Sequence, residues 1–362
     1  MTGVRHYLEN KLDIFSDNPA IEKKPFEMKF SEYPVLSELA LTYKCNLKCQ
    51  FCYAGCNCTT NPTGSDEVLS VEEFKVIIDK IFQQAKVPSI SFTGGEPALF
   101  KGLTELVAYA KSYDMRVNLI TNGTMVSKEL ANDLVAAGLD SVQVSLEGVS
   151  PEIHDSLVQI KGAYSKTRKA IEYFKEKGIH IHTNSTITRL NLEECTRMPA
   201  FVKDELKLDK FSMNLLIPTG SGGLFDHLVV TYSEIGSYLK QIKTESDRLG
   251  IEFMWYSPVP MCMFNTITSG LGNKGCSACD GLISVAPNGD VLPCASYDDP
   301  VGNLAKGDFK GIWKSTKSRL YRDKALAHDM CKNCEQFHIC NGACPLYWRH
   351  QGFSELENNM IQ

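Results

Sequence analysis

Three closely spaced cysteines form the most reactive short pattern in the chain. Cys45, Cys49 and Cys52 follow an apolar stretch from Val35 to Tyr43, in the spacing Cys-x3-Cys-x2-Cys. Structural zinc sites usually have four ligands in two separated Cys-x-x-Cys pairs. A [4Fe–4S] cluster held by only three thiolates keeps one iron open for a ligand that is not protein. The run therefore predicts such a cluster, and a redox pair or a chance group of cysteines is the alternative.

A second set of cysteines occupies the last third of the chain. The protein has 14 cysteines, and seven of them lie between residues 276 and 344. Four follow the spacing Cys-x2-Cys-x5-Cys-x3-Cys, namely Cys331, Cys334, Cys340 and Cys344. A zinc ribbon is the alternative here, but zinc sites favour two paired knuckles, and the first cysteine run makes iron–sulfur the better interpretation.

Four other cysteines have no assigned ligand role. Cys56 and Cys58 closely follow the first run and are either redox-active or free thiols. Cys195 lies in a segment that we expect to be helical, where it is structural. Cys262 is either a buried free thiol or a substitute for one of the cysteines in the upstream part of the second set.

The sequence predicts alternating strands and helices that position these residues. The expected strands are Leu36–Tyr43, Ser89–Thr93, Arg116–Thr121, Ser141–Leu146, His180–Thr188 and Phe211–Leu216. The expected helices are Ser70–Gln84, Gly102–Ser112, Ser127–Ala137, Tyr164–Lys177, Leu192–Leu206 and Tyr232–Leu249. Six such units are too few to close an eight-unit barrel, so we expect an α/β fold with an open, TIM-like partial (β/α)6 barrel. Its ligands bind at the carboxyl ends of the strands, where the first cysteine run begins.

The pattern changes beyond Met261 to cysteines, short strands and turns. Residues 282–286 and 290–293 predict a β-hairpin, because the Asn-Gly pair between them suits a tight turn. Residues 310–328 are expected to be helical. We therefore predict a lead-in at 1–34, the partial barrel at 35–260, a small Cys-rich α+β domain at 261–350 and a tail at 351–362.

Composition excludes several classes of protein. Hydrophobic residues make up 43% and charged residues 22%, as in soluble globular proteins. The net charge of −5, without a long Lys/Arg block, gives no sign of nucleic-acid binding. No apolar run approaches the roughly 18 residues of a spanning helix, and charges throughout the start argue against a signal peptide or membrane anchor. Many cysteines without a secretory signal predict a cytoplasmic protein with metal sites.

The first cysteine run, with Phe51 just before its third cysteine, resembles the signature of the radical S-adenosylmethionine (radical SAM) superfamily. In that superfamily the open iron binds the amino and carboxylate groups of SAM. An electron from the cluster splits SAM into methionine and a 5′-deoxyadenosyl radical. The resemblance therefore implies an enzyme and a low-potential electron donor of the flavodoxin or ferredoxin type.

The resemblance also implies residues that contact SAM. Gly94, Gly95 and Glu96 are similar to the glycine-rich segment that meets the amino group of SAM, where a carboxylate can oppose the ammonium charge. The other implied contacts lie at strand ends or beside the cluster and are Phe51, Tyr53, Asn122, Ser145, Glu147, Arg189 and Leu216. Each has a plainer alternative, as a turn residue, a strand cap, a core residue or a shield over the cluster.

The second set resembles the SPASM extension of radical SAM enzymes, which also includes a Gly-x4-Cys run, here Gly289 to Cys294. The resemblance implies two auxiliary iron–sulfur clusters, which we expect to be [4Fe–4S]. The first takes Cys276, Cys279, Cys294 and Cys344, and the second takes Cys331, Cys334 and Cys340. The final downstream cysteine of the pattern is missing, so the second cluster needs a fourth ligand other than cysteine (Asp, Glu, His or water), an open iron or another nuclearity.

SPASM enzymes oxidise peptides, proteins and some small molecules, and we expect a maturase that modifies a peptide or protein side chain. Sulfatase-maturating relatives carry an Asp directly after the cysteine that here is Cys294, and Ala295 disfavours that activity. The lead-in is also too short for a fused leader-binding domain. One alternative is a small-molecule substrate, such as a tetrapyrrole side chain that is decarboxylated or dehydrogenated, or an antibiotic precursor. Another is a non-catalytic iron–sulfur carrier, which would not need the Gly-Gly-Glu segment.

Overall fold

The computed structural model describes residues 33–56 and 67–360. The lead-in up to residue 32 and Cys58 lie outside the described residues. All described residues belong to one compact unit, Glu32–Gln362. Within the described ranges, no helix has both the length and the apolar character needed to cross a membrane.

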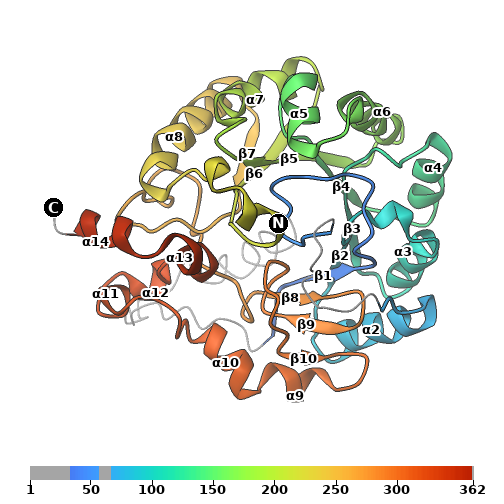
Figure 1. Ribbon diagram of the computed structural model, residues 1–362. Coiled ribbons are helices and arrows are strands. Elements are labelled where there is room, and N and C mark those ends of the chain that lie inside the picture. Colours follow the sequence, from blue (N-terminus) through green and yellow to red (C-terminus); the bar gives the residue numbers. More distant parts are fainter. Residues whose placement is uncertain (1–32, 57–66, 361–362) are drawn as a thin grey trace, which may run out of the picture. The chain divides into compact units, whose positions relative to one another are not determined.

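A ten-stranded sheet organises this unit, in the order β10-β9-β8-β1-β2-β3-β4-β5-β6-β7. The strands are β1 (Leu36–Ala40), β2 (Ser89–Thr93), β3 (Arg116–Thr121), β4 (Ser141–Ser145), β5 (His180–Ile187), β6 (Lys210–Leu215), β7 (Glu252–Trp255), β8 (Leu282–Val285), β9 (Asp290–Leu292) and β10 (Gly302–Asn303). Neighbours from β8 through β1 to β7 are parallel, whereas β9 is antiparallel to both β8 and β10. Figure 1 shows the parallel strands along an open, curved arc with helices on its outer side.

The helices follow the strands along the chain. The longer ones are α2 (Val71–Gln83), α3 (Leu103–Lys111), α4 (Lys128–Ala136), α5 (Pro151–Val158), α6 (Ala163–Lys175), α7 (Leu192–Asp204) and α8 (Tyr232–Leu249). The shorter ones are α9 (Phe309–Trp313), α10 (Thr316–Arg322), α11 (Asp329–Lys332), α12 (Phe337–Cys340), α13 (Pro345–Gln351) and α14 (Ser354–Met360). The 3-10 helices among the described residues are η2 (Pro97–Leu99), η3 (Gly220–Leu224) and η4 (Asp226–Leu228). Capping boxes begin α2 at Ser70 and α8 at Thr231, which satisfies backbone donors of the first turn.

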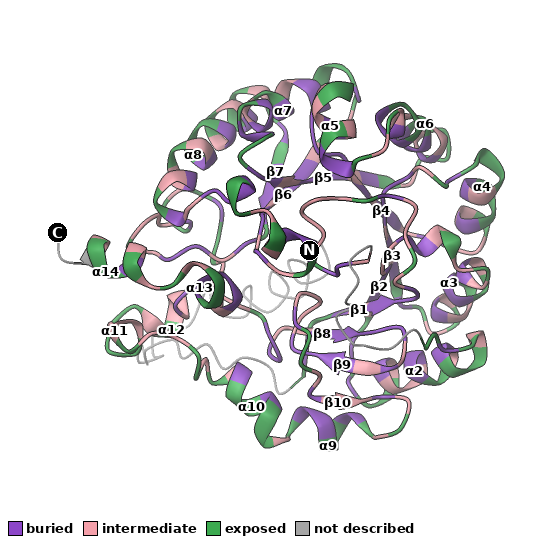
Figure 2. Cartoon of the chain, viewed as in Figure 1, coloured by how far each residue is buried: buried purple, intermediate pink, exposed green. Residues whose placement is uncertain are grey.

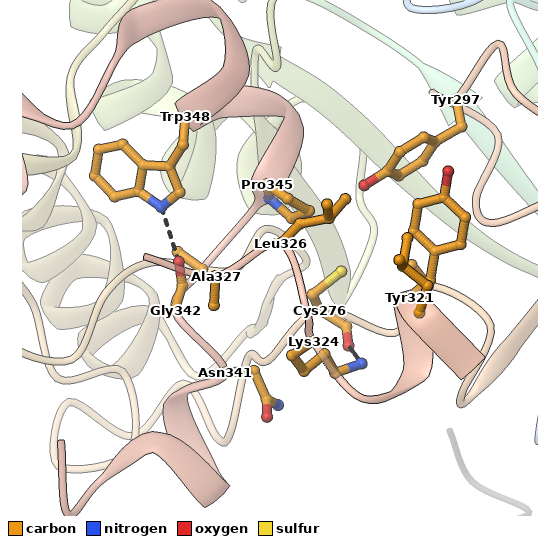
Figure 3. A pocket seen from close by; sticks show the side chains of 13 residues that line it. Cys276, Tyr297, Tyr321, Lys324, Leu326, Ala327, Asn341, Gly342, Pro345 and Trp348 are labelled. Atoms are coloured by element: carbon orange, nitrogen blue, oxygen red, sulfur yellow. Dashed lines mark hydrogen bonds between the residues drawn. The ribbon is translucent and has the colours of Figure 1, made fainter. Parts of the chain in front are cut away.

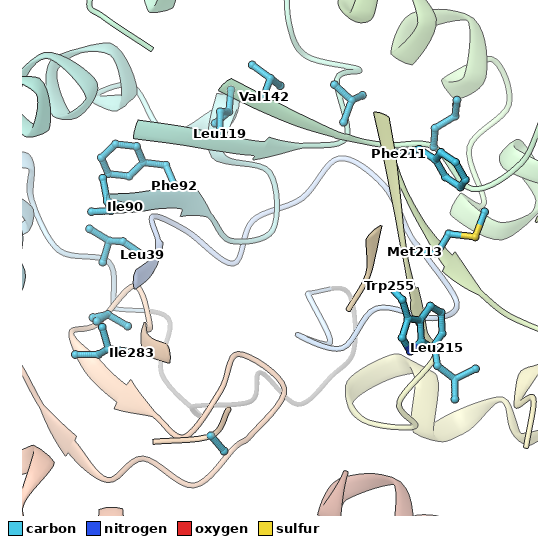
Figure 4. Close-up of a cluster of buried hydrophobic side chains, with 14 of the residues drawn as sticks. Leu39, Ile90, Phe92, Leu119, Val142, Phe211, Met213, Leu215, Trp255 and Ile283 are labelled. Atoms are coloured by element: carbon cyan, nitrogen blue, oxygen red, sulfur yellow. The ribbon is translucent and has the colours of Figure 1, made fainter. Parts of the chain in front are cut away.

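The two faces of the sheet carry different side chains because successive residues of a strand point in opposite directions. Leu39, Phe92 and Leu119 belong to the apolar set that packs between strands and helices (Figure 4). Figure 2 shows the same burial along the strands and the sheet-facing sides of the helices. The opposite face is polar and bonded across strands: Asn118 Nδ2 donates to Ser91 Oγ at 3.3 Å.

The predicted fold class and the elements up to residue 249 are confirmed, with ends within about three residues. The sequence missed α5 and β7, which are short. The helix expected at 310–328 is instead two helices, because Ser315 accepts a hydrogen bond from the Ser318 backbone N–H and starts α10 anew. The predicted hairpin is the pair β8–β9, but β8 also pairs with β1. The sheet therefore continues past residue 260, and the domain boundary there stays a prediction.

Candidate functional site

The first cysteine run lies in the loop after β1, which neighbouring elements hold in place. Lys48 N–H donates to the carbonyl of Val158 at 3.0 Å, and Gln50 N–H donates to the carbonyl of Leu157 at 3.1 Å, both at the end of α5. From the other side, the Ser221 N–H of η3 donates to the Cys52 carbonyl at 2.9 Å. Two elements from distant parts of the chain, α5 and η3, thus fix the backbone of this loop.

The three thiols of this run influence one another electrostatically. Burial raises the pKa of Cys49 well above its usual value, and Cys52, Glu147 and Cys45 raise it further. Within residues 33–56 and 67–360, no three His, Cys, Asp or Glu side chains converge on a single metal ion. A [4Fe–4S] cluster binds each cysteine through a different iron and does not require such convergence. Three neighbouring thiols around a fixed loop fit the donor set of that cluster.

Two hydrogen-bond donors point at one sulfur of this run, that of Cys45. The Leu47 N–H donates to Cys45 Sγ at 3.5 Å, and the Asn122 Nδ2 donates to the same sulfur at 3.8 Å. Cys56 hydrogen-bonds to Cys52, which lowers the pKa of the Cys52 thiol and raises that of Cys56. Cys56 is thus a partner of the first run, and such hydrogen bonds stabilise thiolate sulfur and tune a bound cluster.

Close backbone packing, which the sequence did not reveal, explains why glycine occupies positions 94 and 95. The Gly95 N–H donates to the Thr42 carbonyl at 2.7 Å, and the Glu96 N–H donates to the Lys44 carbonyl at 2.9 Å. A Cβ at Gly95 would lie 2.4 Å from the Lys44 oxygen, and one at Gly94 would lie 2.3 Å from the Thr42 oxygen. The glycines therefore let the loop after β2 lie directly on the segment that leads into the first cysteine run.

The carboxylate of Glu96 is buried and joins the ends of β2 and β3. One oxygen accepts from Thr121 Oγ1 at 2.7 Å and from the Ala98 N–H at 3.0 Å, and the other accepts from the Asn122 N–H at 2.8 Å. Burial raises its pKa, and these hydrogen bonds lower it. Glu96 therefore positions Asn122, whose amide contacts Cys45. Its predicted contact with SAM stays a prediction.

Glu147 is a second buried carboxylate near the same loop. Its side chain accepts a hydrogen bond from the Thr186 N–H at 2.7 Å. Burial raises its pKa to about 8, so it is largely protonated at neutral pH. Ser145, the other predicted residue of this pair, ends β4 and is half-buried opposite Asn184 of β5.

The remaining predicted contacts differ in their surroundings. Arg189 donates to both carboxylate oxygens of Glu234 at 2.8 and 2.7 Å, so its guanidinium is engaged by the first turn of α8. Leu216 is fully buried in the main apolar core, and Phe51 is half-buried against it. Tyr53 is 37% exposed and borders a pocket.

That pocket was not anticipated from the sequence. It has an empty volume of about 270 Å³ and lies between β1, the loops around the first cysteine run and the β8–β9 hairpin. Glu38 of β1 lines it and accepts a hydrogen bond from Ser284 Oγ of β8 at 3.0 Å. Tyr53 and Ala295 line it from the two cysteine regions. No Lys, Arg or His occurs among the described lining residues. The sequence offered one sign of this pocket, the charged residue Glu38 within a strand that was expected to be central.

We call Cys276, Cys279, Cys294 and Cys344 the upstream set. Burial raises the pKa of Cys294 well above its usual value, and Cys276 and Cys344 raise it further. Cys276 also raises the pKa of Cys279, whose main shift comes from burial. The four predicted ligands are therefore electrostatic neighbours around Cys276.

Two cations and a cavity accompany the upstream set. Lys324 Nζ donates to the Cys276 carbonyl at 2.6 Å (Figure 3). Arg322 Nε donates to the Cys279 carbonyl at 2.9 Å. The cavity has an empty volume of about 330 Å³, and Trp348 closes part of it while donating to the Gly342 carbonyl at 2.8 Å. The cations oppose the negative charge that a thiolate-bound cluster would carry.

We call Cys331, Cys334 and Cys340 the downstream set; these residues span α11 and α12. Burial raises the pKa of Cys331 to about 11, and among the neighbouring thiols Cys340 contributes most to the rise. The expectation of a buried Cys262 is wrong, because that residue is exposed. Cys195 is buried in α7, as expected for a structural residue.

Comparison with known proteins identifies the class. The model of the radical SAM superfamily matches residues 39–198, and the model of SPASM, an iron–sulfur cluster-binding domain, matches residues 276–335. The chain belongs to the radical SAM superfamily and carries a SPASM domain. It is therefore a radical SAM iron–sulfur enzyme.

Individual relatives differ in what they act on. The chain is 28% identical to an AdoMet-dependent heme synthase of Oleidesulfovibrio alaskensis, over 89% of this chain and 84% of the relative. It is 27% identical to a PqqA peptide cyclase of Xanthomonas axonopodis pv. citri, over 88% and 84%. Streptococcus suis SuiB bound to the precursor peptide SuiA has a similar fold, with a TM-score of 0.73 at 18% identity over 96% of this chain and 84% of SuiB.

Proposed function

We propose that the protein cleaves SAM reductively at a [4Fe–4S] cluster held by Cys45, Cys49 and Cys52, and oxidatively modifies a peptide or protein side chain. When bound, the cluster and SAM supply an electron and a 5′-deoxyadenosyl radical that removes a hydrogen atom from an unactivated carbon. The protein's own residues hold the sulfurs, shape the pocket and exclude water. Donors from Leu47 and Asn122 stabilise Cys45 as a thiolate.

We keep the predicted SAM contacts as part of this proposal. Glycines 94 and 95 support it best, because they lie on the backbone beside the first cysteine run. Tyr53 borders the pocket next to that run. Arg189 has the least support, since Glu234 already binds its guanidinium.

The polarity of the pocket carries the choice of substrate class. Glu38 is the acidic residue of a lining that has no cation among its described residues, and burial raises the pKa of its carboxyl group. A tetrapyrrole substrate presents carboxylate side chains, which would lie against Glu38 without a cationic partner, and burying such charges unpaired is costly. A peptide presents amides, which the side chain of Glu38 can hydrogen-bond whether it is protonated or ionised. Relatives of both classes match this chain at nearly equal identity, so our choice of a peptide substrate is supported by the pocket and not by the relatives.

The auxiliary sites complete the oxidation in this proposal. Removing a hydrogen atom leaves one further electron to be taken from the substrate. Ala295, which directly follows Cys294, lines the same pocket as Tyr53. A substrate in this pocket would lie between the first cysteine run and the upstream set, and iron–sulfur clusters are suited to accepting the electron.

The test uses the full chain reconstituted with iron and sulfide under anaerobic conditions. With dithionite and SAM we expect release of 5′-deoxyadenosine, and Cys45→Ala should abolish it while the control Cys195→Ala retains it. Absence of release from the unaltered protein, or equal release from Cys45→Ala, would overturn the proposal. The substrate class is tested by adding a short peptide encoded beside the gene or an iron–coproporphyrin. Decarboxylation or dehydrogenation of the porphyrin, with no change in the peptide, would favour the small-molecule alternative when read by mass spectrometry.

A further inference from the structure

The downstream set has three cysteines, and residues 345–362 contain no further cysteine. A [4Fe–4S] cluster on three thiolates has an open iron. Whether the second auxiliary cluster is open decides what it can do: an open iron binds exogenous ligands, whereas a closed cluster only carries electrons. The structure places a further thiol beside this set.

The neighbouring thiol is that of Cys262, in the loop after β7. The N–H of the preceding residue, Met261, donates to Cys340 Sγ at 3.4 Å, which brings this loop directly to the third cysteine of the downstream set. The thiols also interact: besides burial, Cys340 and Cys334 raise the pKa of Cys262, and Cys262 in turn raises that of Cys331. All three members of the downstream set are thus electrostatic neighbours of Cys262.

Hydrogen bonds and packing hold this loop in place. The N–H groups of Met263 and Phe264 both donate to the Pro260 carbonyl, at 2.9 and 3.0 Å, which closes a turn around Cys262. Asn359 Nδ2 of α14 donates to the Cys262 carbonyl at 3.1 Å. A ligand on a backbone fixed from two sides keeps its sulfur near the downstream set.

The backbone between Cys340 and Cys344 separates the two sets. Asn341, Gly342 and Ala343 all have positive φ angles, of 59°, 72° and 65°. Three consecutive left-handed residues turn the chain sharply, and the two non-glycine residues adopt this conformation at a cost. Cys344 thereby joins the upstream set, next to Cys276, while Cys340 faces the loop of Cys262. Cys262 accordingly belongs with the downstream set and not with the upstream one.

Nearby groups of the alternative ligand types have other partners. The Asp329 carboxylate pairs with Lys332 Nζ at 3.2 Å. His338 Nδ1 lies 2.9 Å from the carbonyl of Glu335. His328 Nε2 lies 3.7 Å from a Glu357 oxygen. Ligation by Asp329 through its paired oxygen or by His328 through Nε2 would disturb a contact, whereas the Nδ1 bond of His338 leaves its Nε2 free. Cys262 is favoured over these groups because its loop already contacts Cys340.

We infer that Cys262 provides the fourth thiolate of the second auxiliary cluster, in place of the missing downstream cysteine. The inference rests on the proposed assignment of Cys331, Cys334 and Cys340 to an iron–sulfur cluster. Binding releases the thiol proton of Cys262 and leaves every iron with a cysteine ligand. The cluster is then closed and acts as an electron relay that binds neither SAM nor substrate.

The test uses the full chain with Cys45, Cys49 and Cys52 all changed to alanine, so that only the auxiliary clusters load. In this background we add Cys262→Ala, and Cys195→Ala serves as the matched control. We expect Cys262→Ala either to lose the iron of one cluster, about four irons per chain, or to show a [3Fe–4S] electron paramagnetic resonance signal after mild oxidation. The control should show neither change. Iron content and spectra of Cys262→Ala that match the control would overturn the inference.

A second measurement needs no variant. Cys262 is exposed, so as a free thiol it should react readily with iodoacetamide. In the reconstituted protein we expect it to stay unmodified until the iron is removed by a chelator, as read by peptide mass spectrometry. Alkylation of Cys262 in fully loaded protein would contradict the inference. In contrast, a Cys331→Ala variant that loses no iron would contradict the assignment of the downstream set itself.

Discussion

The substitution Gly95→Ala tests whether glycine is needed for the close contact between the Gly-Gly-Glu segment and the backbone that leads from β1 into the first cysteine run. A Cβ there would lie 2.4 Å from the Lys44 oxygen and 2.8 Å from the Tyr43 oxygen. Ordinary van der Waals contact begins at 3.4 Å, so the two backbones must separate by about 1 Å, the difference between 3.4 and 2.4 Å.

This separation would break two backbone hydrogen bonds. The Gly95 N–H to Thr42 carbonyl and Glu96 N–H to Lys44 carbonyl distances, 2.7 and 2.9 Å, would both exceed 3.5 Å. Overpacking costs about 1–3 kcal/mol. Two lost hydrogen bonds add about 1 kcal/mol each. We therefore expect Gly95→Ala to lower the free energy of unfolding by about 3–5 kcal/mol.

The assay compares urea unfolding of the metal-free variants. Gly281→Ala is the matched control, because a Cβ there would meet its nearest atom, Ser277 Cβ, at 3.8 Å. Its expected effect is within about 0.5 kcal/mol. After reconstitution, Gly95→Ala should also bind less iron at the first cysteine run, since the loop that carries these cysteines is displaced. If both variants unfold at the same urea concentration, the close contact does not constrain this segment.

Two further predictions concern the buried groups around the first cysteine run. The folded-state pKa of Glu147, about 8, lies above its unfolded value, so its stabilising effect is complete below pH of about 4.5 and is lost as the pH rises through 8. Glu147→Gln keeps an acceptor for the Thr186 N–H but cannot ionise. Between pH 6 and 8 its free energy of unfolding should therefore fall less than that of the unaltered protein, by up to about 1.4 kcal/mol per pH unit. If the urea midpoints of the two proteins shift equally between these pH values, the prediction is wrong. Asn122→Ala removes a hydrogen-bond donor from Cys45 Sγ and should make the reduction potential of the radical cluster more negative. Asn118→Ala, on the same face of the sheet, is the control. If a redox titration gives the two variants identical potentials, the Asn122 amide does not tune the cluster.

Many of the strands and helices, and the type of chemistry, could be predicted from residues that are close together in the sequence. Alternating strands and helices follow from apolar periodicity, and Ser70 with Glu73 marks the start of α2 because a capping box is a local pattern. The spacing of the first cysteine run predicted its chemistry, because thiolate number and spacing largely decide what a short loop can bind. The family models then confirmed the class.

The residues that the sequence could not assign depend on contacts between distant segments. Glu38 and Ser284 are 246 positions apart and meet only because β8 adds to the edge of the barrel sheet beside β1. Met261 and Cys340 are 79 positions apart, and their contact is what brings Cys262 to the downstream set. Local patterns determine which elements form and which residues are reactive. Tertiary packing decides which reactive residues share a site, because that depends on how whole strands and loops are placed against one another.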